Sequence, residues 1–138
     1  MNPILRNTLA AISGVVVGSV VNMGLINAGP LVVPLPEGAA TAESFKASLD
    51  LYSPINFLFP FLAHALGTLS GAAIAARIAA SREMLMALGV GVFFLAAGAM
   101  MVGMVGGPVW FSVGDLLLAY LPMGYLGGIL GKGKSGIQ

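Results

Sequence analysis

The feature that most constrains this chain is that its charged residues divide it into four long segments that carry no charge. The uncharged segments are residues 7–36, 51–76, 84–114 and 116–131. A helix needs about 20 predominantly apolar residues to cross the hydrocarbon core of a bilayer. We interpret each segment as holding one such helix. The predicted fold class is therefore an all-α membrane protein, a single domain built as a four-transmembrane-helix bundle.

Composition supports a membrane protein and excludes several other classes. Charged residues make up 8% of the 138 residues, whereas a soluble domain has about 25%. The net charge is +1, so the chain has no basic patch for nucleic acid. The absence of cysteine excludes disulfides, thiolate metal ligands and a cysteine nucleophile.

Proline and glycine indicate where the spans begin and end. Gly29-Pro30 is expected to stop the first span, and Ser53-Pro54 to begin the second with a hydroxyl cap. Pro60 and Pro122 are expected to kink the second and fourth spans, because each removes a backbone donor. The predicted spans are residues 6–29, 54–80, 83–105 and 110–130.

Residues 30–53 form the predicted outer loop. Its first half is rich in proline and extended, and its second half, Thr41 to Leu51, is predicted to form a short interfacial helix. This helix would be either a lid of packing residues or a gate over a cavity.

The basic residues predict an orientation. Five of the six fall on one side of a four-span chain, and only Lys46 falls on the other; the five are Arg6, Arg77, Arg82, Lys132 and Lys134. By the positive-inside rule both termini are then cytoplasmic. A multi-pass protein of the cell membrane is expected, and the compact chain suggests a bacterial inner membrane.

Small residues recur at a spacing of four in every span. Such stripes allow helix backbones to approach closely where lipid gives no hydrophobic driving force between helices. We expect them to pack the bundle, and we expect a homo-oligomer or a larger membrane complex because four short helices enclose little interior. The predicted packing glycines are Gly14, Gly18, Gly67, Gly71, Gly124 and Gly128.

Three polar residues fall inside three different predicted spans, all in the outer half of the bilayer: Asn22, His64 and Asp115. Ionisable side chains inside a membrane mark functional sites by default. The sharper hypothesis is that Asp115 accepts a hydrogen bond from His64, which would create a polar intramembrane site that binds and releases a proton. Thr68 shares the stripe of His64 and belongs to the predicted site. Asn27, Tyr120 and Tyr125 could extend it.

Structural alternatives stand beside this hypothesis. Asn22 could form an interhelical hydrogen bond, and His64 could be a buried structural donor. Asp115 could cap the start of a span within reach of water.

Other chemistry has less support. Met100, Met101 and Met104 are expected to pack in the core rather than to bind copper. No nucleophile elbow, phosphate loop or dinucleotide motif is present, so we expect neither an enzyme nor a bound metal or cofactor. The predicted function is the translocation of a proton, ion or small solute through the polar site. The alternative is an accessory or scaffold subunit of a larger membrane complex.

Overall fold

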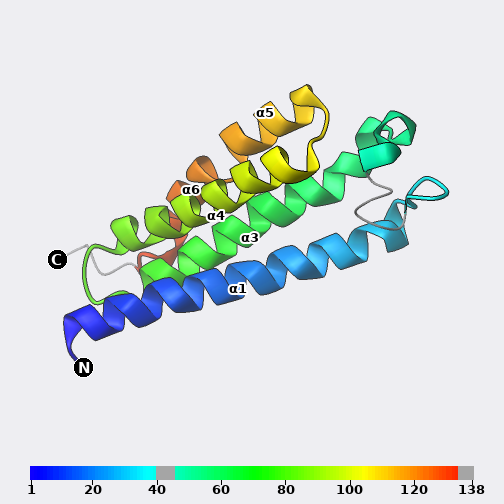
Figure 1. Cartoon of the computed structure of the whole chain (residues 1–138). Helices are drawn as coiled ribbons and strands as arrows, with labels where there is room; N and C mark the ends of the chain where they lie inside the picture. The colour runs from blue at the N-terminus through cyan, green and yellow to red at the C-terminus, as the bar shows by residue number, and fades with distance from the viewer. Residues whose placement is uncertain (40–45, 134–138) are drawn as a thin grey trace.

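The computed structural model describes residues 1–39 and 46–133, and within them it contains helices and no strand. Four helical segments of this described part are long and apolar enough to cross a membrane (Figure 1). They are Pro3–Val32, Pro54–Ile78, Glu83–Val105 and Val109–Gly131. The chain is thus compatible with a multi-pass membrane bundle.

The elements follow one another up and down the bundle. The first segment is α1 (Pro3–Val32), and the second is a 3-10 turn η2 (Pro54–Phe57) that continues into α3 (Leu58–Ile78). The third is α4 (Glu83–Val105), and the fourth is divided into α5 (Val109–Leu118) and α6 (Leu121–Gly131). We call the end that carries the N-terminus the terminal end, and the end that carries residues 33–39 and 46–53 the loop end.

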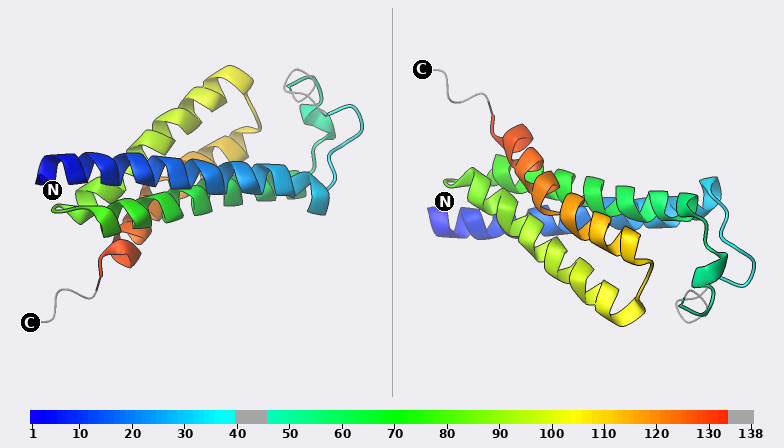
Figure 2. Two further views of the ribbon diagram at one scale, coloured as in Figure 1. Left: turned by 90° about the horizontal axis from the view of Figure 1, so that it is seen from below. Right: turned by 90° about the horizontal axis from the view of Figure 1, so that it is seen from above.

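Helix α3 is the centre of the arrangement. Its most extensive contacts are with α1, followed by α6 and α4. Helix α4 touches α1 at the terminal end and diverges from it toward the loop end (Figure 2). The loop-end half of the bundle is therefore more open than the terminal half.

The end of the first span differs from the prediction. Helix α1 continues through Gly29-Pro30 to Val32, so the expected stop at this pair is wrong. Pro30 lies in the last turn, where its missing N–H leaves only the carbonyl of Ile26 without its helical donor. The N–H of Val33 then closes the helix on the carbonyl of Gly29 at 2.8 Å.

The two internal prolines have different effects. Pro60 lies in the first turn of α3, where no helical N–H is needed, and α3 continues unbroken to Ile78. The expected kink at Pro60 is thus replaced by a change from 3-10 to α geometry at Leu58. At Pro122 the expected kink is confirmed as a break, because α5 ends at Leu118 and α6 begins at Leu121.

Glycines allow the closest helix contacts. A Cβ atom on Gly14 would lie 2.6 Å from the carbonyl oxygen of Gly71, and one on Gly18 would lie 2.7 Å from that of Gly67. In α6, a Cβ on Gly124 would lie 3.3 Å from the Cα of Gly91 in α4. Gly128 likewise lies against Met84 and Ala87 of α4. All six predicted packing glycines therefore lie at helix–helix contacts.

Hydrogen bonds join α1 to the end of α3 at the terminal end. The side-chain oxygen of Asn7 accepts from the N–H of Ala80 at 2.8 Å, and its amide donates to Ser81 Oγ at 3.2 Å. Arg6 Nε donates to the carbonyl of Ile78 at 2.6 Å. The bond from Arg6 pairs a carbonyl that the end of α3 leaves without a helical donor, and the bonds of Asn7 hold the turn after α3 against α1.

The predicted interfacial helix is not confirmed. Its residues 41–45 lie outside the described residues, and the described remainder contains a 3-10 turn, η1 (Leu49–Leu51).

Candidate functional site

His64 and Asp115 lie in direct contact, as the sharper hypothesis required. Nδ1 of His64 in α3 is 2.8 Å from Oδ2 and 2.9 Å from Oδ1 of Asp115 in α5. Asp115 is 3% exposed, whereas the His64 side chain is 28% exposed. The imidazole thus covers a buried carboxyl group and remains accessible itself.

Tyr120 completes the cluster. Its hydroxyl donates to Asp115 Oδ2 at 3.1 Å, and its ring stacks on that of His64 with the centroids 5.7 Å apart. Tyr120 lies in the break between α5 and α6, and it is 2% exposed. Because the chain turns at this break, the Tyr120 side chain reaches the carboxyl group five residues before it.

The cluster borders a cavity of about 100 Å³ between α1, α3 and α4. Asn22, His64, Thr68 and Tyr120 contribute to its wall. Thr68 is 1% exposed, and neither its Oγ1 nor Oδ1 of Asn22 has a hydrogen-bond partner among the described residues. Leaving a buried polar group unpaired costs about 1–3 kcal/mol. The cavity therefore suits water or another small polar species.

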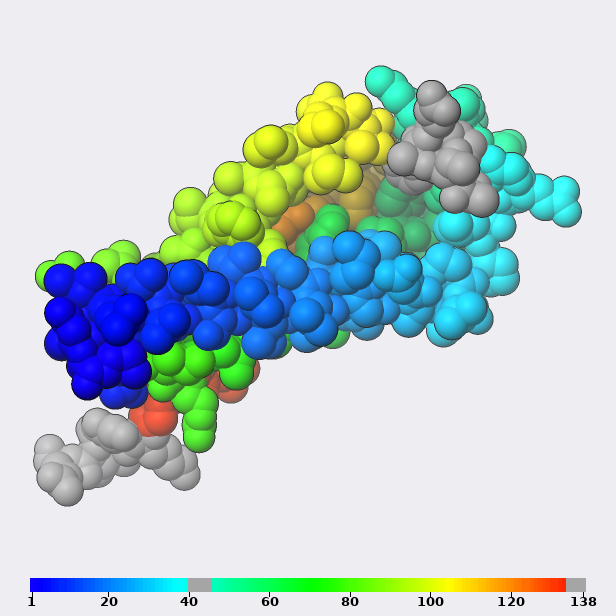
Figure 3. Space-filling view, turned by 60° about the horizontal axis from the view of Figure 1, so that its bottom comes forward, coloured from blue at the N-terminus to red at the C-terminus, as the bar shows by residue number. Residues whose placement is uncertain are grey.

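A hollow between α1 and α4 is visible in the space-filling view, with α3 at its floor (Figure 3). The hollow ends toward the terminal end, where the ring of Phe94 lies against Gly18. Beyond that point the glycine contacts of α1 and α3 close the bundle. The cavity is thus associated with the loop-end half of the protein.

Asp115 also borders a second and separate cavity, of about 470 Å³, between the start of α3 and α5. Phe57, Phe61 and Leu118 contribute to its largely apolar wall. His64 belongs to the wall of the first cavity and Asp115 to that of the second. The hydrogen bond between them therefore joins a wall residue of the first cavity to a wall residue of the second, which is largely open to the outside.

The alternatives for Asn22 and Asp115 are not what the structure shows. Oδ1 of Asn22 makes no interhelical hydrogen bond to any described residue. Asp115 does not cap a span, because it lies inside α5 and is buried. Asn27 bonds the carbonyl of Met23 in its own helix, and Tyr125 is 53% exposed on α6. Neither extends the cluster.

The three methionines of α4 that were expected in the core do not lie there. Met100, Met101 and Met104 are between 56% and 71% exposed within the chain, so the expected core packing is wrong. Among the described residues no group of three or more His, Asp and Glu side chains could hold a metal ion.

Gly98 is a site residue that the sequence analysis missed. It lies in the cavity wall on α4, and the space where its Cβ would stand is occupied by the Tyr120 hydroxyl. Among the many small residues of α4, no local signal distinguishes this one.

Comparison of the chain with protein-family models, with curated proteins and with solved structures gives no match.

Proposed function

We propose that this chain is a small integral membrane translocator, and that the species it binds at the His64–Asp115 pair is a proton. One observation carries the proposal. A buried carboxyl group is held by an imidazole at 2.8 Å and by a phenol at 3.1 Å, beside a cavity with two unpartnered polar atoms.

The chemistry of the pair suits reversible proton binding. A carboxylate near the centre of a membrane-spanning helix costs about 2.5–3.5 kcal/mol on insertion scales. Imidazole is the side chain that ordinarily changes charge near neutral pH. Because Nδ1 of His64 is directed to Asp115, Nε2 is the nitrogen that takes up and releases the proton. The imidazolium formed by uptake then pairs with the Asp115 carboxylate.

Complete translocation would also need a path at the terminal end. There the backbones of α1 and α3 meet at Gly14 and Gly71, with no room for a Cβ atom. We infer that the glycine contacts separate in a second conformation, which connects the cavity to the terminal side. The same proposal extends to a small ion or solute that moves with the proton.

A flux assay tests the proposal. The protein is reconstituted in liposomes that contain a pH-sensitive dye, and an imposed pH gradient is followed with wild-type protein and with His64→Ala. We expect proton flux with wild-type protein and none with His64→Ala. Tyr125→Phe is the matched control, because Tyr125 is exposed on α6 and should leave flux unchanged. Equal flux in His64→Ala and wild type, or no flux in either, would overturn the proposal.

A second candidate, an accessory subunit of a larger complex, has one observation in its favour. Gly89 lies in a groove of about 480 Å³ between the terminal halves of α1 and α4, and the space above it is open within the described chain. An open glycine face can receive a helix of a partner. Purification from a mild detergent tests this candidate, because a foreign membrane complex should then accompany the wild type and be lost with Gly89→Leu.

A further inference from the structure

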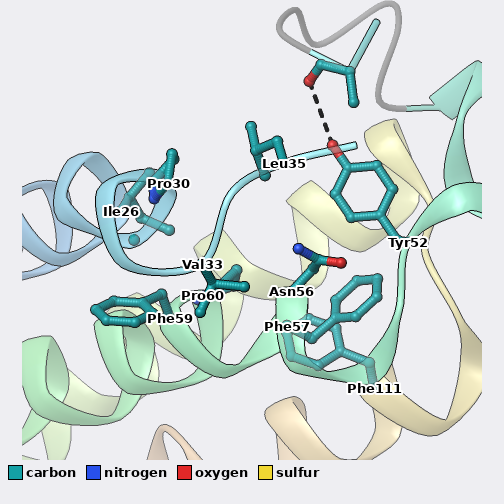
Figure 4. Close-up of a pocket in the computed structure, with 12 residues that line it drawn as sticks. Ile26, Pro30, Val33, Leu35, Tyr52, Asn56, Phe57, Phe59, Pro60 and Phe111 are labelled. Atoms are coloured by element: carbon teal, nitrogen blue, oxygen red, sulfur yellow. Dashed lines mark hydrogen bonds between the residues drawn. The ribbon is translucent and has the colours of Figure 1, made fainter. Parts of the chain in front are cut away.

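A pocket at the loop end lies apart from the proton site. It has a volume of about 290 Å³ and lies between the last turns of α1, the start of α3 and the chain from Val33 to Ala39 (Figure 4). Four aromatic rings contribute to its wall: Tyr52, Phe57, Phe59 and Phe111. The pocket is partly open to the outside, so a small molecule can enter it from the surface.

The polar side chains in the wall already have hydrogen-bond partners. Nδ2 of Asn56 donates to the carbonyl of Pro34 at 3.1 Å, and Oδ1 of Asn56 accepts from the N–H and Oγ of Ser53, both at 3.0 Å. The Tyr52 hydroxyl donates to the carbonyl of Ala39 at 3.4 Å. The wall therefore offers an occupant mainly hydrocarbon and aromatic surface. The carbonyl of Ile26, which Pro30 leaves without its helical donor, remains as a main-chain acceptor.

The shape of the wall is fixed by rigid parts. Pro30 and Pro60 stand on neighbouring helices at the floor, and Gly29 brings these helices together because a Cβ there would lie 2.7 Å from the Cβ of Phe59. Phe57 and Phe111 lie with their centroids 4.8 Å apart. Aromatic rings prefer edge-to-face or offset contacts with another ring.

Ligand sites begin at about 300 Å³, so the pocket admits a single small molecule.

We propose that this pocket binds a small apolar ring compound, of the class of a substituted benzene. The proposal does not rest on proton binding at His64. The pocket lies against the loop and the ends of the spans, so the ligand reaches it from the loop-end interface. Small uncharged aromatic compounds partition from water into the bilayer because the transfer removes their apolar surface from water.

Trp110 gives a direct signal. It is the single tryptophan of the chain, and its ring contacts Phe57 and Phe111 with centroids 5.5 and 5.9 Å away. Both of these phenylalanines line the pocket. The probe is 4-bromotoluene, whose bromine quenches tryptophan fluorescence on close approach. Toluene, which lacks the quencher, competes for the same site.

Two matched variants separate pocket binding from partition into the detergent micelle. Val33→Phe places a ring in the pocket that Val33 lines, whereas Leu31→Phe adds the same group at a residue that is 86% exposed and outside the pocket. We expect saturable quenching that toluene reverses in wild type and in Leu31→Phe, and loss of the reversible part in Val33→Phe. Leu35→Phe, at another lining residue, replaces Val33→Phe if that variant does not fold.

Two results would overturn the proposal. One is quenching that rises without saturation and is not reversed by toluene. The other is reversible quenching of equal size in the blocked variant and in Leu31→Phe. A failure here leaves the flux of the reconstituted protein unaffected, and loss of flux in His64→Ala leaves this titration unaffected, so the two proposals fail separately.

Discussion

The hydroxyl group of Tyr120 occupies the space that a Cβ atom of Gly98 would need. The same hydroxyl donates its hydrogen bond to Oδ2 of Asp115. A residue of α4 that is far from Asp115 in sequence therefore sets the position of a donor to the buried carboxyl group. Gly98 is a positioning residue for the cluster.

This relationship predicts the effect of Gly98→Ala. The added methyl group should displace the Tyr120 ring and lengthen or break its bond to Asp115. Since the chain has one histidine, ¹⁵N-histidine NMR reports the imidazole of His64 without overlap. We expect Gly98→Ala to change the His64 signals in the same direction as Tyr120→Phe. Gly103→Ala, on the same helix with nothing within 4 Å, should leave them unchanged. A wild-type His64 spectrum in Gly98→Ala would contradict this account.

Removing one partner of the His64–Asp115 pair should destabilise the protein more than removing both. His64→Leu leaves a buried carboxyl group with Tyr120 as its remaining partner, at a cost of about 3 kcal/mol, the low end for a broken buried pair. In the double variant His64→Leu/Asp115→Leu the uncompensated charge is absent, so most of this loss should be recovered. Unfolding in detergent, followed by helical circular dichroism, measures both. If the double variant is as unstable as the sum of the two single variants, the residues are not energetically coupled.

The contact between α1 and α3 predicts a strong dependence on glycine. A Cβ on Gly71 would lie 2.5 Å from the carbonyl oxygen of Gly14, so Gly71→Ala should force the helices apart at a cost of about 1–3 kcal/mol. Gly24→Ala on α1 meets nothing within 4 Å and should be neutral or slightly stabilising, because alanine favours the helix. The same unfolding measurement compares the two. Equal stabilities would show that the close contact does not hold the bundle together.

The hydrogen bonds of Asn7 at the terminal end predict a smaller loss of stability when they are removed. Asn7→Ala removes the acceptor for Ala80 N–H and the donor to Ser81, which should cost about 1 kcal/mol. Asn7→Asp keeps the acceptor and should retain part of that stability. The two variants are compared by the midpoint of thermal unfolding. An Asn7→Asp protein no more stable than Asn7→Ala would assign the effect to the donor alone.

The burial of Tyr52 predicts that the stability of the protein falls at alkaline pH. Burial raises the pKa of its phenol above the ordinary value of 10.0. Its contribution to stability is therefore complete below pH 10 and is lost as the pH rises toward the pKa of the folded state. The absorbance of tyrosinate, compared between wild type and Tyr52→Phe, should show that this phenol ionises later than free tyrosine. Ionisation at the ordinary pH would mean that the loop pocket is open to water around Tyr52.

The positions of the four long apolar helices could be predicted closely, because hydropathy and helix ends depend on residues that are neighbours along the chain. The second predicted span, 54–80, differs from the structure by two residues at one end, and the third, 83–105, has the observed bounds. The first span was predicted too short at Gly29-Pro30, because a proline in a last turn does not end a helix. The break at Pro122 could be anticipated, since proline removes a donor wherever it falls inside a helix.

Part of the candidate site could also be predicted from the sequence, and part could not. That His64 and Asp115 could meet followed from their similar depth in different spans, which the rise of 1.5 Å per residue gives without a structure. Tyr120 was one of three residues that could extend the site, but the sequence could not single it out, because the direction of its side chain depends on the break between α5 and α6. The role of Gly98 depends in turn on how α4 is rotated about its axis.

By itself, the sequence determined that the chain has four apolar helices, where each lies, and which few polar side chains they carry. These properties depend on residues that are neighbours along the chain. Only the folded chain shows that α4 diverges from α1, that the cavity beside His64 lies between them, and that four rings line a separate pocket at the loop end. The rotation of each helix about its axis and the angles at which helices cross are set by contacts between residues distant in sequence. Hydropathy and residue spacing along the chain therefore do not predict them.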